Sequence, residues 1–115
     1  MLIMKHWYLQ TLFAFLLLVT WSCNEEDKDT TKPWIILKGP STVYTPLNEP
    51  YIDSGAYAYD LGKYGDTLDI SDRLQVTDNV NTSEIGKYWV KYNVEDEAGN
   101  KADEVTRTVY VQIFK

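Results

Sequence analysis

Residues 88–95 read YWVKYNVE and residues 105–114 read VTRTVYVQIF, so apolar and polar side chains alternate in both runs. Alternation with a period of two is typical of a β-strand that buries one face. The residues between the runs begin DEAGNK and are rich in turn formers, which predicts an antiparallel hairpin. In its turn we expect positive φ at Gly99 and Asn100, and backbone N–H groups donating to Asp96.

The predicted register of this hairpin pairs Val94 with Val105, which gives one apolar face and one mixed face. It sets opposite each other Tyr92 and Arg107, Val90 and Val109, Tyr88 and Val111 and, on the mixed face, Trp89 and Tyr110. Arg107 is the charged exception on the apolar face. Since an unpaired buried charge is costly, we expect its guanidinium to lie on the Tyr92 ring or to reach a carboxylate, in a structural role.

Short apolar-alternating runs, separated by Gly, Pro, Asn and Asp, also fill the chain from residue 34 up to the hairpin. No segment has the period of a helix. Spacing of this kind favours an all-β, antiparallel β-sandwich of about seven strands. The five further strands are expected near Trp34–Leu37, Thr42–Tyr44, Gly55–Tyr59, Thr67–Ile70 and Leu74–Thr77.

The N-terminal residues have the pattern of a secretory signal peptide. Lys5 precedes a mostly apolar run whose uninterrupted core, Leu12–Val19, is too short for a transmembrane helix. Residues 19–23 read VTWSC and end in the only cysteine of the chain. They resemble a bacterial lipobox, in which the cysteine is lipidated and becomes the new N-terminus. We expect a lipoprotein signal peptide over residues 1–22 and a lipid on Cys23, with an ordinary cleaved signal and a stray cysteine as the alternative.

Acidic residues follow the cysteine. Residues 24–29 read NEEDKD, which looks like the acidic export signal of Bacteroidetes lipoproteins on the outer face of the outer membrane. Residues 23–32 lack apolar periodicity, so we expect a lipidated, flexible tether there. The formal net charge of −6 and the lack of a Lys/Arg cluster exclude a nucleic-acid-binding surface. The expected membrane contact is therefore the acyl chain.

Three motifs occur in order along the remaining chain. They are PWIILKG at 33–39, YIDSGAYAYD at 51–60, and a closing hairpin running from IGKY at 85–88 to RTVYV at 107–111. Together they resemble the bacterial surface immunoglobulin-like domain, which is also found as a module in some pesticidal crystal proteins. The resemblance implies one immunoglobulin-like β-sandwich over residues 33–115.

Such a fold assigns structural roles to several motif residues. The small Ala56 and Ala58 are expected to face the opposing sheet, which turns Tyr57 and Tyr59 outward. Tyr88 resembles the tyrosine corner of immunoglobulin-like sandwiches, whose hydroxyl donates to upstream backbone.

Catalytic chemistry is not expected. The only histidine, His6, lies in the predicted signal peptide, and the only cysteine is the predicted lipidation site. A Ser/His or Cys/His nucleophile system therefore cannot be assembled, and zinc lacks ligands. No cofactor is expected, except that calcium is possible because aspartates gather in one loop-rich stretch. The candidate calcium ligands are Asp60, Asp66 and Asp69.

Outward aromatic residues are the candidate ligand contacts: Trp89 and Tyr110, expected side by side, and Tyr57 and Tyr59. Aromatic faces stack on sugar rings or anchor protein interfaces, although cross-strand aromatic pairs also stabilise a sheet by roughly 0.2–1 kcal/mol each. The sequence predicts a surface-exposed outer-membrane lipoprotein that acts as a non-catalytic binding or adhesion module for a glycan or protein. Two alternatives stay open: a structural spacer or accessory subunit of an outer-membrane nutrient-uptake complex, and a fragment of a larger multidomain surface protein.

Overall fold

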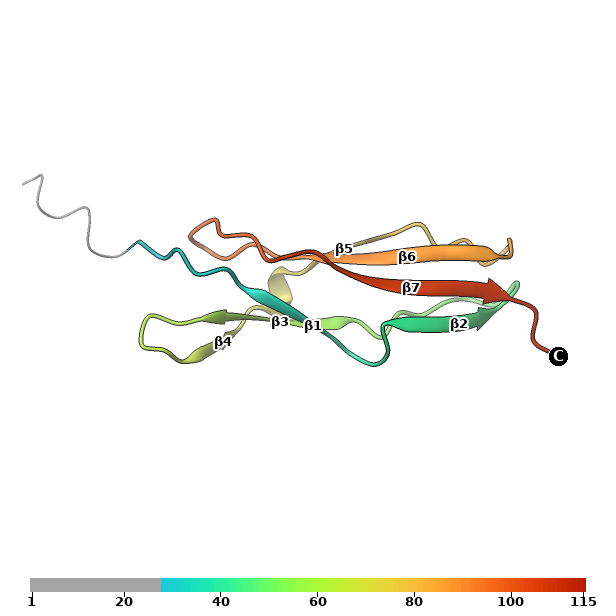
Figure 1. Cartoon of the computed structure of the whole chain (residues 1–115), viewed down its shortest axis with the longest axis horizontal. Coiled ribbons are helices and arrows are strands. Elements are labelled where there is room, and N and C mark those ends of the chain that lie inside the picture. The colour runs from blue at the N-terminus through green and yellow to red at the C-terminus, as the bar shows by residue number, and fades with distance from the viewer. Residues whose placement is uncertain (1–27) are drawn as a thin grey trace, which may run out of the picture.

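The structure is a computed structural model that describes residues 28–115, in which seven strands form two facing sheets (Figure 1). Sheet A has the strand order β1 (Trp34–Leu37), β3 (Ala56–Leu61), β4 (Thr67–Asp69). Sheet B has the order β2 (Thr42–Pro46), β7 (Val105–Gln112), β6 (Gly86–Asn93), β5 (Gln75–Asp78). A 3-10 turn, η1 (Ser71–Arg73), joins β4 to β5. The predicted all-β sandwich is confirmed, and each predicted strand is present with its ends shifted by at most two residues.

The predicted signal peptide, Cys23 and the predicted tether up to residue 27 lie outside the described residues. Between residues 28 and 115, no helix has the length and apolar character needed to cross a membrane. Residues 28–32 of the predicted tether contact the sandwich. The Asn100 side-chain amide donates to the Asp29 carbonyl at 3.0 Å, and Lys32 pairs with Asp103 at 3.4 Å.

The chain moves from sheet A to sheet B between β1 and β2. Gly39, at φ 76°, makes this turn in a backbone region that side chains disfavour. The Thr108 N–H then donates to the Ser41 carbonyl at 2.8 Å, and β2 continues beside β7 as a parallel neighbour. This pairing differs from the antiparallel prediction. The two strands are far apart in sequence, so no hairpin fixes their relative direction.

The predicted register of the β6–β7 hairpin is wrong by two residues, because Val105 pairs with Tyr92. The turn closes early: Ala102 N donates to the Val94 carbonyl at 3.0 Å. Between these two contacts the chain leading into β7 has two residues, 103 and 104, whereas the β6 side has one, Asn93. The additional residue forms a β-bulge. A shift by an even number leaves every side chain on its predicted face. The apolar face was therefore predicted correctly even though its cross-strand partners were not.

The turn itself is held by Asp96. Its carboxylate accepts the Asn100 backbone N–H at 2.8 Å and the Asn100 side-chain amide at 2.9 Å. Burial opposes ionisation of Asp96, but these hydrogen bonds and those from the Ala98 and Gly99 backbone hold its pKa below the usual value. Gly99 has the predicted positive φ, at 90°, whereas Asn100 is not among the described residues with positive φ.

The core lies between the two sheets. Its buried apolar residues are Ala56, Ala58, Val90, Tyr92, Val94, Val109 and Val111. Ala56 and Ala58 thus face inward as predicted. Their small size lets sheet A approach the larger side chains of sheet B closely.

Tyr88 forms the predicted tyrosine corner, because its hydroxyl donates to the Glu84 carbonyl at 2.8 Å. Tyr88→Phe removes this bond and keeps the ring, so we expect a loss of about 1 kcal/mol in unfolding free energy. Urea unfolding at neutral pH measures it. A variant as stable as the natural protein would show that the corner contributes nothing.

Arg107 is fully buried and ties both sheets to the loop before β3. Its Nη1 donates to Asp53 at 2.8 and 2.9 Å and to the Tyr92 hydroxyl at 2.9 Å. Its other nitrogens donate to the carbonyls of Pro40, Lys38 and Gly55. The guanidinium was expected to lie on the Tyr92 ring or to reach a carboxylate, and it does both, because it also lies 5.8 Å from the centre of the Tyr92 ring. Asp53 was not predicted as its partner.

Candidate functional site

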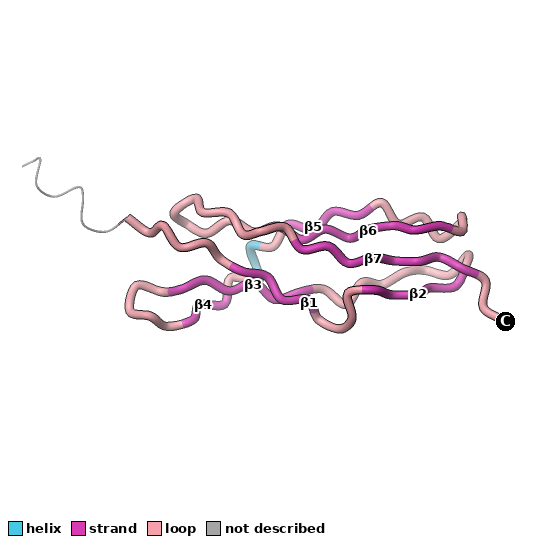
Figure 2. The backbone as a smooth tube through the Cα atoms, in the orientation of Figure 1, coloured by secondary structure: helices cyan, strands magenta, loops and turns pink. Residues whose placement is uncertain are grey.

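The outer side of sheet A carries a row of apolar and aromatic side chains. Alternation along β1 and β3 points Ile35, Leu37, Ala56 and Ala58 inward, so their neighbours along the strands point outward. No other labelled strand lies over this side of the sheet in Figure 2. The outward residues are Trp34, Ile36, Tyr57, Tyr59 and Leu61, and we call them the aromatic face.

Three rings of the aromatic face form a continuous surface. Trp34 lies opposite Tyr59, with ring centroids 6.1 Å apart, and Tyr59 is again 6.1 Å from Tyr57. The exposed fractions are 38% for Trp34 and 41% for Tyr57. Ile36, which lies opposite Tyr57, is 51% exposed. An exposed patch of adjoining rings can contact a ligand by stacking.

Polar groups of both signs border the aromatic face. The Lys38 Nζ lies 4.3 Å from the centre of the Tyr57 ring. Asp69, on β4, lies opposite Tyr59, and its Oδ1 accepts the Ser71 hydroxyl at 2.6 Å and the Ser71 N–H at 2.9 Å. These hydrogen bonds, with a smaller contribution from the Lys38 charge, hold the pKa of Asp69 below its usual value. An ammonium and a carboxylate therefore border the same rings.

The predicted Trp89–Tyr110 pair is not formed. With the corrected register, Trp89 lies opposite Thr108 and Tyr110 opposite Lys87 on the outer side of sheet B. Tyr110 stacks on Tyr44 instead, with centroids 5.3 Å apart. The Lys91 Nζ lies 4.3 Å over the Trp89 ring. The four predicted aromatic contacts thus divide between two faces, and Tyr57 and Tyr59 are the two brought together.

Trp34 was missed as a site residue. Its outward direction follows from the alternation of residues 34–37, which the sequence shows. Its place beside Tyr59 depends on the pairing of β1 with β3, and no sequence pattern fixed that pairing.

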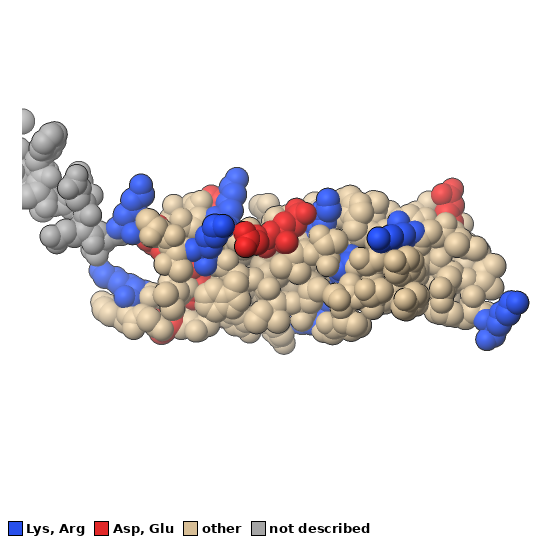
Figure 3. All heavy atoms as spheres, viewed as in Figure 1, with Lys and Arg blue, Asp and Glu red and all other residues tan. Residues whose placement is uncertain are grey.

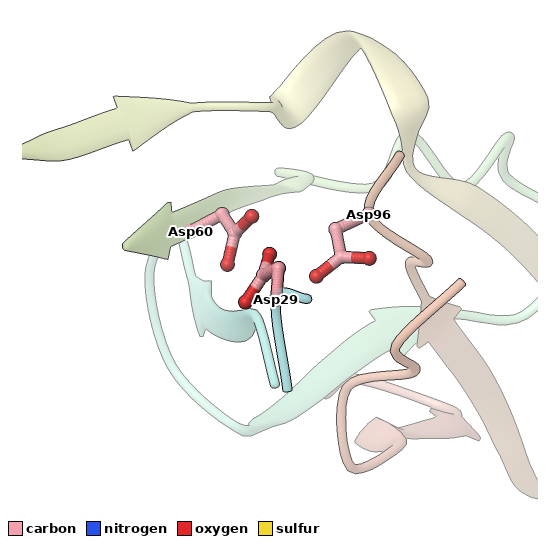
Figure 4. Close-up of side chains that lie close together, drawn as sticks. All are labelled: Asp29, Asp60 and Asp96. Carbon is pink, nitrogen blue, oxygen red and sulfur yellow. The ribbon is translucent and has the colours of Figure 1, made fainter. Parts of the chain in front are cut away.

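The three predicted calcium ligands are not brought together. Asp60 instead meets Asp29 and Asp96, with one ligand oxygen from each lying within 4.8 Å of the others (Figure 4). Asp69 binds Ser71, and Asp66 closes the β3–β4 loop by accepting the Gly62 N–H at 2.7 Å through its backbone. Carboxylate oxygens are the ligands that calcium prefers. In the described chain, Asp29, Asp60 and Asp96 are thus the residues able to hold such an ion.

Charge repulsion within this acidic cluster is testable. Burial, and then the charges of Asp96 and Asp29, raise the pKa of Asp60. When a carboxyl group has a higher pKa in the folded state than in the unfolded state, its ionisation destabilises the folded protein. This loss begins as the pH rises above the unfolded-state pKa of about 3.9. Asp60→Asn should therefore stabilise the protein at pH 7 in EDTA by about 1 kcal/mol, and not at acid pH.

Urea unfolding of the Asp60→Asn variant at pH 7 and below pH 4 measures this effect, with the exposed Asp72→Asn as the matched control. A variant that is less stable than the natural protein at pH 7 would contradict repulsion as the dominant effect.

Comparisons with known proteins agree with this architecture. A family model described as "Bacterial surface protein, Ig-like domain" matches residues 35–111. The lipoprotein BT2262 from Bacteroides thetaiotaomicron is similar in structure, with a TM-score of 0.57 and 25% identity over 72% of this chain and 39% of that one. A search of curated proteins gave no match.

A second similar structure contains CBM51-2 in complex with GlcNAc and the INT domains of Clostridium perfringens ZmpB. Its TM-score is 0.52 and its identity 27%, over 72% of this chain and 17% of that one. The present chain therefore spans well under two thirds of the length of either solved relative.

Proposed function

This chain belongs to the family of bacterial surface proteins with an Ig-like domain, and from that membership we propose that it is a non-catalytic, glycan-binding surface module. A lipid on Cys23 holds it at the outer face of the outer membrane. The glycan docks on the aromatic face of sheet A.

The exposed aromatic face is the observation that carries this proposal. Trp34, Tyr57 and Tyr59 present adjoining rings on a side of the sandwich where no described strand packs. Exposed apolar patches on soluble domains commonly mark binding sites, and aromatic rings stack on the apolar faces of sugars. A similar solved structure contains a carbohydrate-binding module in complex with GlcNAc, which supports the glycan class.

The absence of catalysis is proposed from composition. Residues 28–115 contain neither histidine nor cysteine, so nucleophile systems that depend on either residue are not available there. Of the three grouped carboxylates, Asp60 is buried and points to the opposite side of β3 from Tyr59 and Leu61. Binding, and not bond cleavage, is the activity that these residues support.

The proposed lipid anchor predicts a clear difference in extraction. The natural protein should partition into the detergent phase of cell extracts, whereas Cys23→Ser should move to the aqueous phase, because stable membrane attachment depends on buried acyl chains. Protease digestion of intact cells reports the outer-surface location. A Cys23→Ser protein that stays in the detergent phase would contradict lipidation at this residue.

A glycan array probed with the detergent-solubilised full-length protein tests the binding function. We expect saturable binding to at least one glycan, retained in the Tyr44→Ala variant, which alters the other sheet. An array without binding, together with co-purification with an outer-membrane transporter, would replace the glycan-binding function with the accessory role.

A further inference from the structure

The composition of the aromatic face restricts the class of glycan that it accepts. We propose that the face selects neutral oligosaccharides of at least two sugar units, and that Lys38 and Asp69 set this selectivity. This inference rests on the proposed function and deepens it.

The minimum length follows from the layout of the rings. Trp34, Tyr59 and Tyr57 adjoin at successive centroid separations of 6.1 Å across β1 and along β3. One sugar ring covers one aromatic ring face, so a single unit leaves most of this surface exposed to water. A chain of two or three units covers neighbouring rings at once and gains from each of them.

The preference for neutral sugars follows from the charges at the border. Lys38 lies over Tyr57 and Asp69 beside Tyr59, so any acidic sugar that approaches Lys38 also approaches a carboxylate. The formal net charge of −6 adds a further repulsion. Sugar hydroxyl groups both donate and accept hydrogen bonds, and therefore suit an ammonium and a carboxylate together.

Both charged groups keep bonding capacity for a ligand. The hydrogen bonds that the described residues donate to Asp69 end on Oδ1, which leaves Oδ2 as an acceptor. The Lys38 ammonium, in the same described region, contacts the Tyr57 ring and has no hydrogen bond to a protein acceptor. Acidic and basic side chains are also interspersed on the part of the surface visible in Figure 3, with both signs on one face.

The test measures affinities of the full-length protein in detergent for two series of defined oligosaccharides. The neutral series contains glucose, xylose and GlcNAc oligomers of one to four units, and the acidic series contains oligogalacturonides of the same lengths. We expect the best neutral trimer to bind about tenfold more tightly than its monomer, and about tenfold more tightly than trigalacturonate.

Two variants assign this selectivity to the charged groups. Asp69→Asn keeps the acceptor for Ser71 and should bring trigalacturonate close to the affinity of the neutral trimer. Lys38→Met should weaken trigalacturonate binding further. Lys87→Met is the matched control on sheet B, where Lys87 lies opposite Tyr110, and it should change neither affinity.

The outcomes separate this inference from the function on which it rests. Glycan binding that is independent of length, equal for acidic oligomers, or unchanged in Asp69→Asn would overturn the inference and leave the glycan-binding module in place. No binding on the array and no binding in the titrations of either series would overturn the inference and the glycan-binding function together.

Discussion

Replacing Arg107 with alanine should destabilise the domain by about 3–5 kcal/mol, a large part of the unfolding free energy of a small domain. The variant removes a fully buried cation and leaves Asp53 without its counter-charge. It also removes the donor to the Tyr92 hydroxyl and to the backbone carbonyls of Pro40 and Lys38. Unsatisfied buried groups carry the full cost of desolvation. The loss of unfolding free energy should therefore exceed that of a small apolar truncation such as isoleucine to valine.

Urea unfolding followed by tryptophan fluorescence measures the loss. Arg73→Ala is the matched control, because Arg73 donates one hydrogen bond to the Glu95 carbonyl at 2.9 Å from an exposed position, and it should cost less than about 1 kcal/mol. If Arg107→Ala does not fold, Arg107→Lys gives the measurable case, since lysine keeps the charge and loses the forked geometry. A loss no larger than that of Arg73→Ala would contradict the role of the network.

The same network predicts sensitivity to acid. Burial raises the pKa of Asp53, but the hydrogen bonds from Tyr51, Arg107 and Gly55 outweigh it and leave the pKa below the usual value. A carboxyl group with a lowered folded-state pKa stabilises the folded protein at pH values above its unfolded-state pKa of about 3.9. This stabilisation is lost as the pH falls from there through the folded-state pKa. The difference in unfolding free energy between the Arg107→Lys variant and the natural protein should therefore become smaller below pH 4.

The double variant Trp34→Ala/Tyr59→Ala should lose glycan binding by about a hundredfold or more, because two adjoining rings of the aromatic face are removed. The fold should survive. Both residues point outward, and exposed cross-strand aromatic pairs contribute only about 0.2–1 kcal/mol. Isothermal titration with the strongest binder from the array measures the change.

Tyr44→Ala is the matched control for this variant. Tyr44 is 57% exposed and stacks on Tyr110 on the opposite side of the sandwich. Its truncation removes one exposed aromatic contact without touching sheet A. Equal losses of affinity in both variants, or none in the double variant, would place the glycan elsewhere.

The fold could be predicted from local alternation, because a period of two fixes which side chains face inward. Ala58, Val109 and Arg107 are buried as expected for this reason. The register could not be predicted, because it depends on where the turn closes, with Glu95 paired to Lys101, and on one additional residue between Ala102 and Val105. No composition signal distinguishes that bulge from a longer turn.

The candidate site was only half predicted, for a related reason. Tyr57 and Tyr59 lie on one strand, so alternation alone places them together. Trp34 and Lys38 reach them through the pairing of β1 with β3, and Asp69 through the pairing of β3 with β4. The expected pair of Trp89 and Tyr110 failed because a cross-strand pair depends on exact register.

The most direct test of the glycan-binding face is a nuclear magnetic resonance titration of the isotope-labelled full-length protein in detergent with the best glycan of the array. We predict that the largest amide shift changes fall on residues 34–38, 56–61 and 67–69, the strands of the aromatic face and Lys38. Changes confined to the outer side of sheet B, around Tyr44 and Tyr110, or to Asp29 and Asp96 of the acidic cluster would contradict the account.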